Sequence, residues 1–194
     1  MEVNIEPGYI ILRHTKGWAP TAWGIRKLTG SYWNHVGGVV IEEGNKVKVI
    51  EADPPVVKKT PVAEYVDPKK FDIKIVALRE DAFKDQTEYD TAVVHSTIFL
   101  QSKIGFKYDT KAIFWLALRY TVLSWFRHPK DNPLQDREKF FCSELICNAW
   151  HGTSSIIEHL FAGVKHPEAE CCTITPKDIG KTVNVKYIAG KNVI

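Results

Sequence analysis

Three side chains in this 194-residue chain have the types needed for an activated-cysteine site. Cys142 follows two phenylalanines at the predicted start of a helix, where the aligned peptide dipoles favour the thiolate form. His35 begins one predicted strand, and Glu51 lies near the end of the next. A thiolate is a nucleophile, an imidazole transfers protons, and a carboxylate orients the imidazole. If the fold brings them together, these residues predict nucleophilic catalysis at Cys142.

Each of the three residues is a weak signal when taken alone. A cysteine among apolar neighbours is most often a small buried hydrophobic residue. A lone histidine in a strand is usually structural, and a glutamate at a strand end is usually a solvated charge. Their distance in sequence is no obstacle, because catalytic groups meet in space. The remaining six histidines have no better context.

The elements that must position these residues follow from apolar patterning and turn residues. We expect strands over residues 9–12, 35–41, 46–51, 71–78 and 183–188, a further extended piece over 56–65, and helices over 19–29, 84–102 and after Thr175. The second and third strands form a hairpin with a turn at 43–45. Strands gather early and helices follow, which predicts an α+β fold. The length fits a single domain, 1–194.

Residues 112–126 are apolar around nearly their whole circumference, with Arg119 in the middle. As a helix they would span about 22 Å, too short for a hydrocarbon core of about 30 Å, so we expect no transmembrane segment. A buried core helix is the simplest interpretation. The alternative is an apolar helical insertion or lid within 110–139 that contacts a lipid or partner, because the segment lies just before Cys142.

Composition and charge exclude several classes of protein. The net charge is only +3 and both signs are interspersed, so we expect no nucleic-acid partner. Residues 1–7 lack the basic start and apolar run of a secretory signal, which predicts a cytoplasmic protein.

The four cysteines predict neither a disulfide framework nor a zinc site. Cys171 and Cys172 are adjacent, and Cys147 shares a predicted helix with Cys142 at a poor angle for pairing. No Cys-x-x-Cys pair is present, and the histidines lack the spacing of metal ligands. We expect reduced thiols, no metal and no cofactor.

Six short motifs occur in a definite order along the chain. They are GYIIL at 8–12, HVG at 35–37, IEA at 50–52, GFKYD at 105–109, FCSEL at 141–145 and TPKD at 175–178. Together they resemble the circularly permuted NlpC-type papain-like amidases and peptidases of the YaeF/YiiX branch. In that family the histidine and the acid precede the cysteine. The chain departs from the family pattern at Tyr9, at Gly38 and in a longer segment over 109–139.

The resemblance implies a papain-like fold, in which an antiparallel sheet packs on a helix that presents the cysteine. It makes Cys142 the nucleophile, His35 the general base and acid, and Glu51 the orienting carboxylate. Tyr108 matches a tyrosine near the family's site, where it would donate to the oxyanion or line the pocket. Trp33 and Ser143 are further candidates for substrate binding or oxyanion stabilisation. The amide of Cys142 is another oxyanion donor.

The leading hypothesis is a cysteine hydrolase that cleaves an amide bond in a peptide-like or peptidoglycan-like substrate through an acyl-enzyme. An acyltransferase or thioesterase that acts on a lipid-linked acyl group is the first alternative, favoured by the apolar 112–126 segment. A non-catalytic binding module on the same fold is the second, and a metal hydrolase has little support. Fold alone does not select among these activities.

Overall fold

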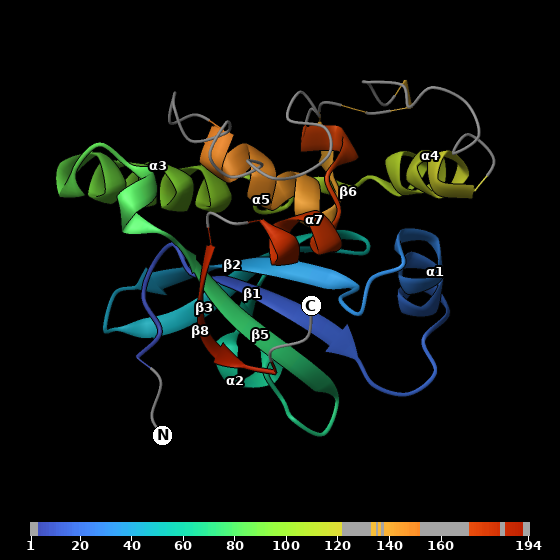
Figure 1. Cartoon of the computed structure of the whole chain (residues 1–194), viewed down its shortest axis with the longest axis horizontal. Helices are drawn as coiled ribbons and strands as arrows, with labels where there is room; N and C mark the ends of the chain where they lie inside the picture. The colour runs from blue at the N-terminus through green and yellow to red at the C-terminus, as the bar shows by residue number, and fades with distance from the viewer. Residues whose placement is uncertain are drawn as a thin grey trace.

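The computed structural model describes residues 4–121, 133–134, 136, 138–151, 171–182 and 185–191, and it combines one curled sheet with a layer of helices (Figure 1). The elements in chain order are β1 (Ile10–Thr15), α1 (Pro20–Thr29), β2 (His35–Glu42), β3 (Lys46–Asp53), β4 (Val56–Pro61), α2 (Val62–Tyr65), β5 (Phe71–Leu78), η1 (Glu80–Ala82), α3 (Gln86–Ser102), β6 (Lys107–Tyr108), α4 (Thr110–Thr121), β7 (Lys139–Phe140), α5 (Cys142–His151), η3 (Cys171–Thr173), α7 (Pro176–Lys181) and β8 (Val185–Gly190).

The sheet has the strand order β7-β6-β4-β3-β2-β1-β5-β8, and its pairs are antiparallel except for the parallel pair β6–β7. The predicted hairpin is confirmed as β2 and β3, with Glu42 opposite Lys46. Its turn contains Gly44 and Asn45, both with positive φ, a conformation that glycine and asparagine adopt most readily. A mostly antiparallel sheet combined with helices agrees with the predicted α+β class.

Alternation along the central strands gives the sheet two apolar faces. Leu12, Val36 and Ile50 face the layer that contains α3 and α5, and they belong to the larger buried cluster. On the opposite face, Val39 and Val49 pack in a smaller cluster with Tyr65 of α2. Figure 1 shows α3 and α5 on one side of the sheet and α2 on the other.

The close approach of α5 to the sheet depends on Gly38 of β2. A Cβ atom built at this position would lie 2.6 Å from Leu100 Cδ1 of α3 and 3.2 Å from Ile146 Cδ1 of α5. A branched residue here would therefore push both helices outward. Gly38 thus lets the helix that carries Cys142 lie close to the strand that carries His35.

One predicted element differs from the structure in its second half. The extended piece expected over 56–65 is a strand only to Pro61, and Val62–Tyr65 form the short helix α2. The turn buries Tyr65 completely beneath the sheet. Because burial of an aromatic ring contributes a few kcal/mol, this contact outweighs the β propensity of the local sequence. The other predicted strands and helices have bounds close to those expected. Residues 183–184 of the last predicted strand lie outside the described residues.

The apolar segment predicted over 112–126 begins as α4 at Thr110, and its part beyond Thr121 lies outside the described residues. Ala112, Trp115 and Leu116 are buried, whereas Phe114 is largely exposed. One face of α4 therefore belongs to the core, and the face that carries Phe114 is exposed. The helix α4 lies next to α1. Among the described residues, no helix has the length and apolar character needed to cross a membrane.

Candidate active site

Cys142 is the first residue of α5, as predicted. The short strand β7 leads into the helix, and its Phe140 pairs with Tyr108 of β6. The first turn closes with the amide of Leu145 donating to the carbonyl of Phe141 at 3.0 Å. The helix dipole has its positive end at this terminus of α5. Cys142 is 2% exposed.

His35 and Glu51 meet on the sheet at hydrogen-bonding distance. His35 precedes Gly37 by two residues and Glu51 follows Val49 by two, so alternation places both side chains on the face that carries Tyr65. Nε2 of His35 lies 2.6 Å from Oε2 of Glu51, and both side chains are buried. With Nε2 engaged by the carboxylate, Nδ1 is the ring nitrogen left for Cys142.

The ionisation of His35 and Glu51 is coupled to their neighbours. Burial lowers the pKa of His35, but the charge of Cys142 and hydrogen bonds to Cys142 and Glu51 outweigh it and raise this pKa from 6.5 to about 9. Burial raises the pKa of Glu51, whereas His35, Arg13 and Thr60 together lower it from 4.5 to about 2. At neutral pH the pair is therefore an imidazolium beside a carboxylate.

A cavity of about 260 Å³ opens beside this pair. Its lining comes from the ends of β1, β2 and β3, from α1 and from β6, namely Arg13, Thr15, Ala19, Thr21, Ala22, Ile25, Asn34, His35, Asp53, Pro54 and Tyr108. Of the three predicted catalytic residues, only His35 is part of this wall. Most of the lining side chains are small or polar, which suits a compact substrate that carries hydrogen-bonding groups.

Tyr108 of β6 is a wall residue of this cavity, and its predicted role as an oxyanion donor stays a prediction. It lines the cavity together with His35 and is 8% exposed. Burial, followed by the charge of Cys142, raises the pKa of Tyr108 well above its usual value of 10. The phenol therefore keeps its proton and has a hydrogen to donate.

Trp33 and Ser143 are not brought into the cavity wall. Trp33 is 3% exposed and packs against α7, where a Cβ built on Gly180 would lie 3.4 Å from Trp33 Cδ1. The hydroxyl of Ser143 donates to the carbonyl of Ile174 at 2.7 Å, a bond that ties α5 to the chain before α7. Both side chains therefore stabilise the scaffold around the site, and their predicted contact with substrate stays a prediction.

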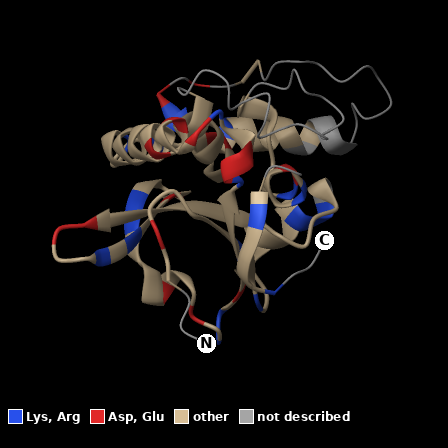
Figure 2. Cartoon of the chain, turned by 60° about the vertical axis from the view of Figure 1, so that its left-hand side comes forward, with Lys and Arg blue, Asp and Glu red and all other residues tan. Residues whose placement is uncertain are grey.

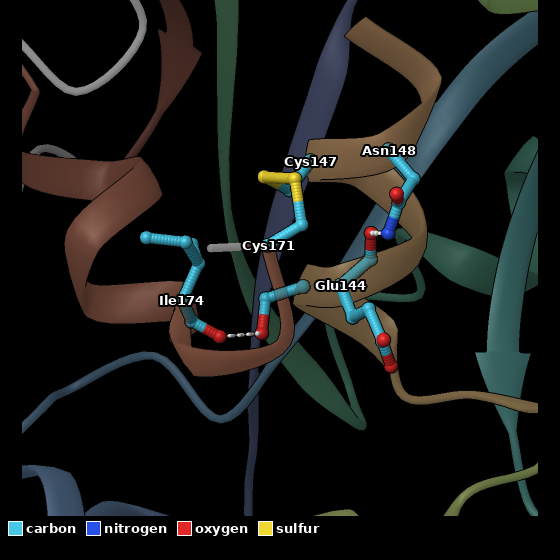
Figure 3. The surroundings of a disulfide bond; sticks show 6 residues. Glu144, Cys147, Asn148, Cys171 and Ile174 are labelled. Carbon is cyan, nitrogen blue, oxygen red and sulfur yellow. Dashed lines mark hydrogen bonds between the residues drawn. A yellow bond between two sulfur atoms is a disulfide. The ribbon is translucent and has the colours of Figure 1, made fainter. Parts of the chain in front are cut away.

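The expectation that no cysteines pair is wrong. Cys147 of α5 forms a disulfide with Cys171 of η3, with a Cα–Cα distance of 5.3 Å (Figure 3). The two cysteines are 24 residues apart in sequence, and they meet because the fold brings η3 against α5. Cys142 and Cys172 remain outside the disulfide, and both are buried. The nucleophile candidate is therefore a thiol.

Comparisons with known proteins support the fold. No family model matches the sequence, and no curated protein matches it. The structure is similar to the crystal structure of the metalloprotein YiiX from Escherichia coli O157:H7, with a TM-score of 0.62 and 14% sequence identity, over 96% of this chain and 97% of that chain. The two proteins share a fold. At this identity the likeness extends to the mixed α+β architecture and does not reach individual residues.

YiiX is described as a metalloprotein, which raises the question of whether this chain has a metal site. No group of three His, Cys, Asp or Glu side chains in those residues is placed to hold a metal ion. Nε2 of His35 and Oε2 of Glu51 are hydrogen-bonded to each other. Within residues 4–121, 138–151 and 171–182 the donor set therefore does not fit a resident metal.

Two residues that sequence reasoning missed contact the carboxylate of Glu51. Thr60 of β4 donates its hydroxyl to Oε1 at 2.5 Å, and Nη2 of Arg13 of β1 lies 3.6 Å from Oε2. Neither residue stands out in sequence, because charged and hydroxyl side chains at strand positions are common. The available signal was alternation, which places Thr60 directly opposite Val49 and hence diagonal to Glu51.

The free energy of unfolding should depend on pH through this site. The pKa of Glu51 is lower in the folded state, so its contribution is present above about pH 4.5 and is lost as pH falls towards 2. The pKa of His35 is higher in the folded state, so its contribution is present below about pH 6.5 and is lost as pH rises through 9. Both contributions are fully present only between about pH 4.5 and pH 6.5, so urea unfolding from pH 3 to 10 should show the greatest free energy of unfolding in that interval.

A Glu51→Gln variant isolates the acid part of this profile. Glutamine keeps the shape of glutamate and can accept a hydrogen bond from His35, but it does not titrate. The stability difference between the parent and the variant should shrink as pH falls from about 4.5 towards 2. A difference that stayed constant over this range would contradict an ionised Glu51 in the folded protein.

Proposed function

We propose that this chain is a cysteine hydrolase that cleaves an amide bond through an acyl-enzyme at Cys142. The observation that carries the proposal is the buried His35–Glu51 pair at 2.6 Å, with Cys142 raising the pKa of His35 from the start of α5. A nucleophile, a base and an orienting carboxylate in contact form the arrangement of an activated thiol.

In this mechanism the thiolate of Cys142 attacks the carbonyl carbon of the substrate, and the carbonyl oxygen becomes an oxyanion. The amide of Cys142 and the hydroxyl of Tyr108 are its donors. The C–N bond then breaks while the imidazolium of His35 gives its proton to the leaving amine. Water attacks the thioester with His35 as base, which releases a carboxylic acid and regenerates the thiolate.

The permuted papain-like arrangement is part of the same proposal. In support of it, His35 and Glu51 come from neighbouring strands that precede the cysteine helix in sequence, and the sheet packs on that helix. A binding module on the same fold is the competing explanation. The buried ionised pair argues against it, because burying these charges is unfavourable unless each stays partnered, and a site without chemistry gains nothing from them.

The cavity favours a peptide-like amide over a long acyl chain. A long hydrocarbon chain requires an extended apolar channel, whereas this cavity presents Arg13, Asn34 and Asp53 among its lining residues. A lipid-linked substrate remains the second candidate because of one specific observation. Trp18, Trp23 of α1 and Phe114 of α4 are largely exposed on neighbouring elements, and exposed aromatic rings suit a membrane interface.

Acyl-enzyme trapping tests the proposal and separates the two substrate classes. The protein is incubated with peptide p-nitroanilides, γ-D-glutamyl peptides, p-nitrophenyl acetate and p-nitrophenyl palmitate, and intact mass is followed with p-nitrophenol or amine release. We expect an acyl group on Cys142 from the amide or acetate substrates and none in Cys142→Ala. Absence of any adduct and of release above the Cys142→Ala background would refute the hydrolase.

Preference for palmitate would support the lipid candidate if it disappeared in Phe114→Ser. This substitution changes an exposed position of α4, whereas truncation would remove the buried Trp115 and damage the core. The cytoplasmic location stays a prediction. The argument from reduced thiols no longer supports it, because the Cys147–Cys171 disulfide is typical of an oxidising compartment.

A further inference from the structure

Four side chains form a row across four adjacent strands of the sheet. Arg13 lies on β1, His35 on β2, Glu51 on β3 and Thr60 on β4, and Arg13 is directly opposite His35 in the ladder. Arg13, His35 and Thr60 all contact Glu51, so one carboxylate receives groups from the three other strands of the row. The proposed mechanism uses only the contact between His35 and Glu51.

The two oxygens of Glu51 have different partners. Oε2 faces both His35, at 2.6 Å, and the guanidinium of Arg13, at 3.6 Å. Within the described part of the chain, the hydroxyl of Thr60 is the single hydrogen-bond partner of Oε1. The last torsion of a glutamate side chain rotates freely over a broad range, so this bond decides which way the carboxylate plane is turned.

Arg13 competes with His35 for the same carboxylate. Its guanidinium is held between the rings of Tyr65 and Phe71, 4.5 Å and 4.4 Å from their centroids, and its Nε is buried without a hydrogen-bond partner. A carboxylate free to turn would offer both oxygens to this fork, the geometry that guanidinium groups favour. The bond from Thr60 opposes that rotation.

We propose that Thr60 is a positioning residue, whose hydroxyl holds the Glu51 carboxylate on His35 and away from Arg13. This inference rests on the proposed function and deepens it. Thr60 does not touch substrate. It acts through Glu51 on His35, and thereby on the fraction of Cys142 present as thiolate.

The test measures alkylation of Cys142 by iodoacetamide between pH 5 and 10, followed by peptide mass spectrometry, so it requires no substrate. Thr60→Val keeps the side-chain shape and removes the hydroxyl, and we expect the rate at pH 6 to fall about fivefold to tenfold, the usual net effect of losing one hydrogen bond. Thr60→Ser retains a hydroxyl and should stay within about twofold of the parent.

Thr97→Val is the matched control, because Thr97 on α3 has a buried hydroxyl without a hydrogen-bond partner and lies outside the site. It should leave the alkylation rate unchanged. Equal slowing by Thr60→Val and Thr60→Ser would overturn the role of the hydroxyl. An unchanged rate in Thr60→Val would also overturn it, and the hydrolase proposal would survive if His35→Ala still slowed alkylation. If His35→Ala were also without effect, the proposed function itself would fail.

Discussion

His35→Ala is expected to slow alkylation of Cys142 by iodoacetamide at pH 6 to 7 by tenfold or more. The imidazolium beside Cys142 stabilises the thiolate, which is the form that reacts, and the variant lacks that charge. Hydrolysis of any amide substrate should fall about 10²- to 10⁴-fold, because the same residue transfers protons in both halves of the reaction. The first measurement uses peptide mass spectrometry, and the second uses initial rates.

Two internal controls make this experiment specific. Cys172 is the other cysteine outside the disulfide, and its alkylation should be the same in both proteins. His95 is exposed on α3, so His95→Ala should leave the reactivity of Cys142 unchanged. Alkylation of Cys142 at equal rates in the parent and His35→Ala would mean that the two residues do not form an ion pair, and the hydrolase proposal would lose its basis.

Gly37→Ala is expected to lower the free energy of unfolding by about 1–3 kcal/mol, the usual effect of an overpacked core. A Cβ atom at Gly37 would lie 2.4 Å from Val49 Cγ1 and 3.0 Å from the hydroxyl of Tyr65. Valine has little freedom to move aside within a strand, so β2 and β3 must separate near the active site. Urea unfolding at pH 6 measures the loss, and alkylation of Cys142 should fall in parallel.

Gly24→Ala is the matched control for this substitution. Gly24 lies within α1, and a Cβ atom there would meet nothing within 4 Å. Alanine has the higher helix propensity, so stability should rise by about 0.5–1 kcal/mol. If both variants were equally stable, the tight packing between Gly37 and Val49 would not be a feature of the folded protein.

Local sequence was sufficient for most of the elements that carry the site. Alternation of lysine with valine and isoleucine predicted β3, and Thr175 followed by a proline predicted the start of α7, where the structure has a capping box between Thr175 and Asp178. The phenylalanine pair before Cys142 marked the start of the helix that carries it. These features depend on neighbours within a few residues, which a sequence displays directly.

What the sequence did not reveal depends on contacts between distant segments. The disulfide needs η3 to lie against α5, and the helical turn at Tyr65 needs the sheet above it. The hydrogen bond from Thr60 to Glu51 needs the register of β3 against β4. The position of Trp33 under α7 has the same origin. Alternation along a strand determines which side chains share a face of the sheet, and tertiary packing determines which residues those side chains contact.

Correct register of four strands is required to bring Arg13, His35, Glu51 and Thr60 together, so the proposed chemistry depends on it. Sliding any one of the four strands by a single residue would turn its member of the row to the other side of the sheet. A misaligned chain could look compact and well ordered and still be inert. Recovery of thiol reactivity during refolding should therefore follow the last strand to pair and lag behind collapse of the chain.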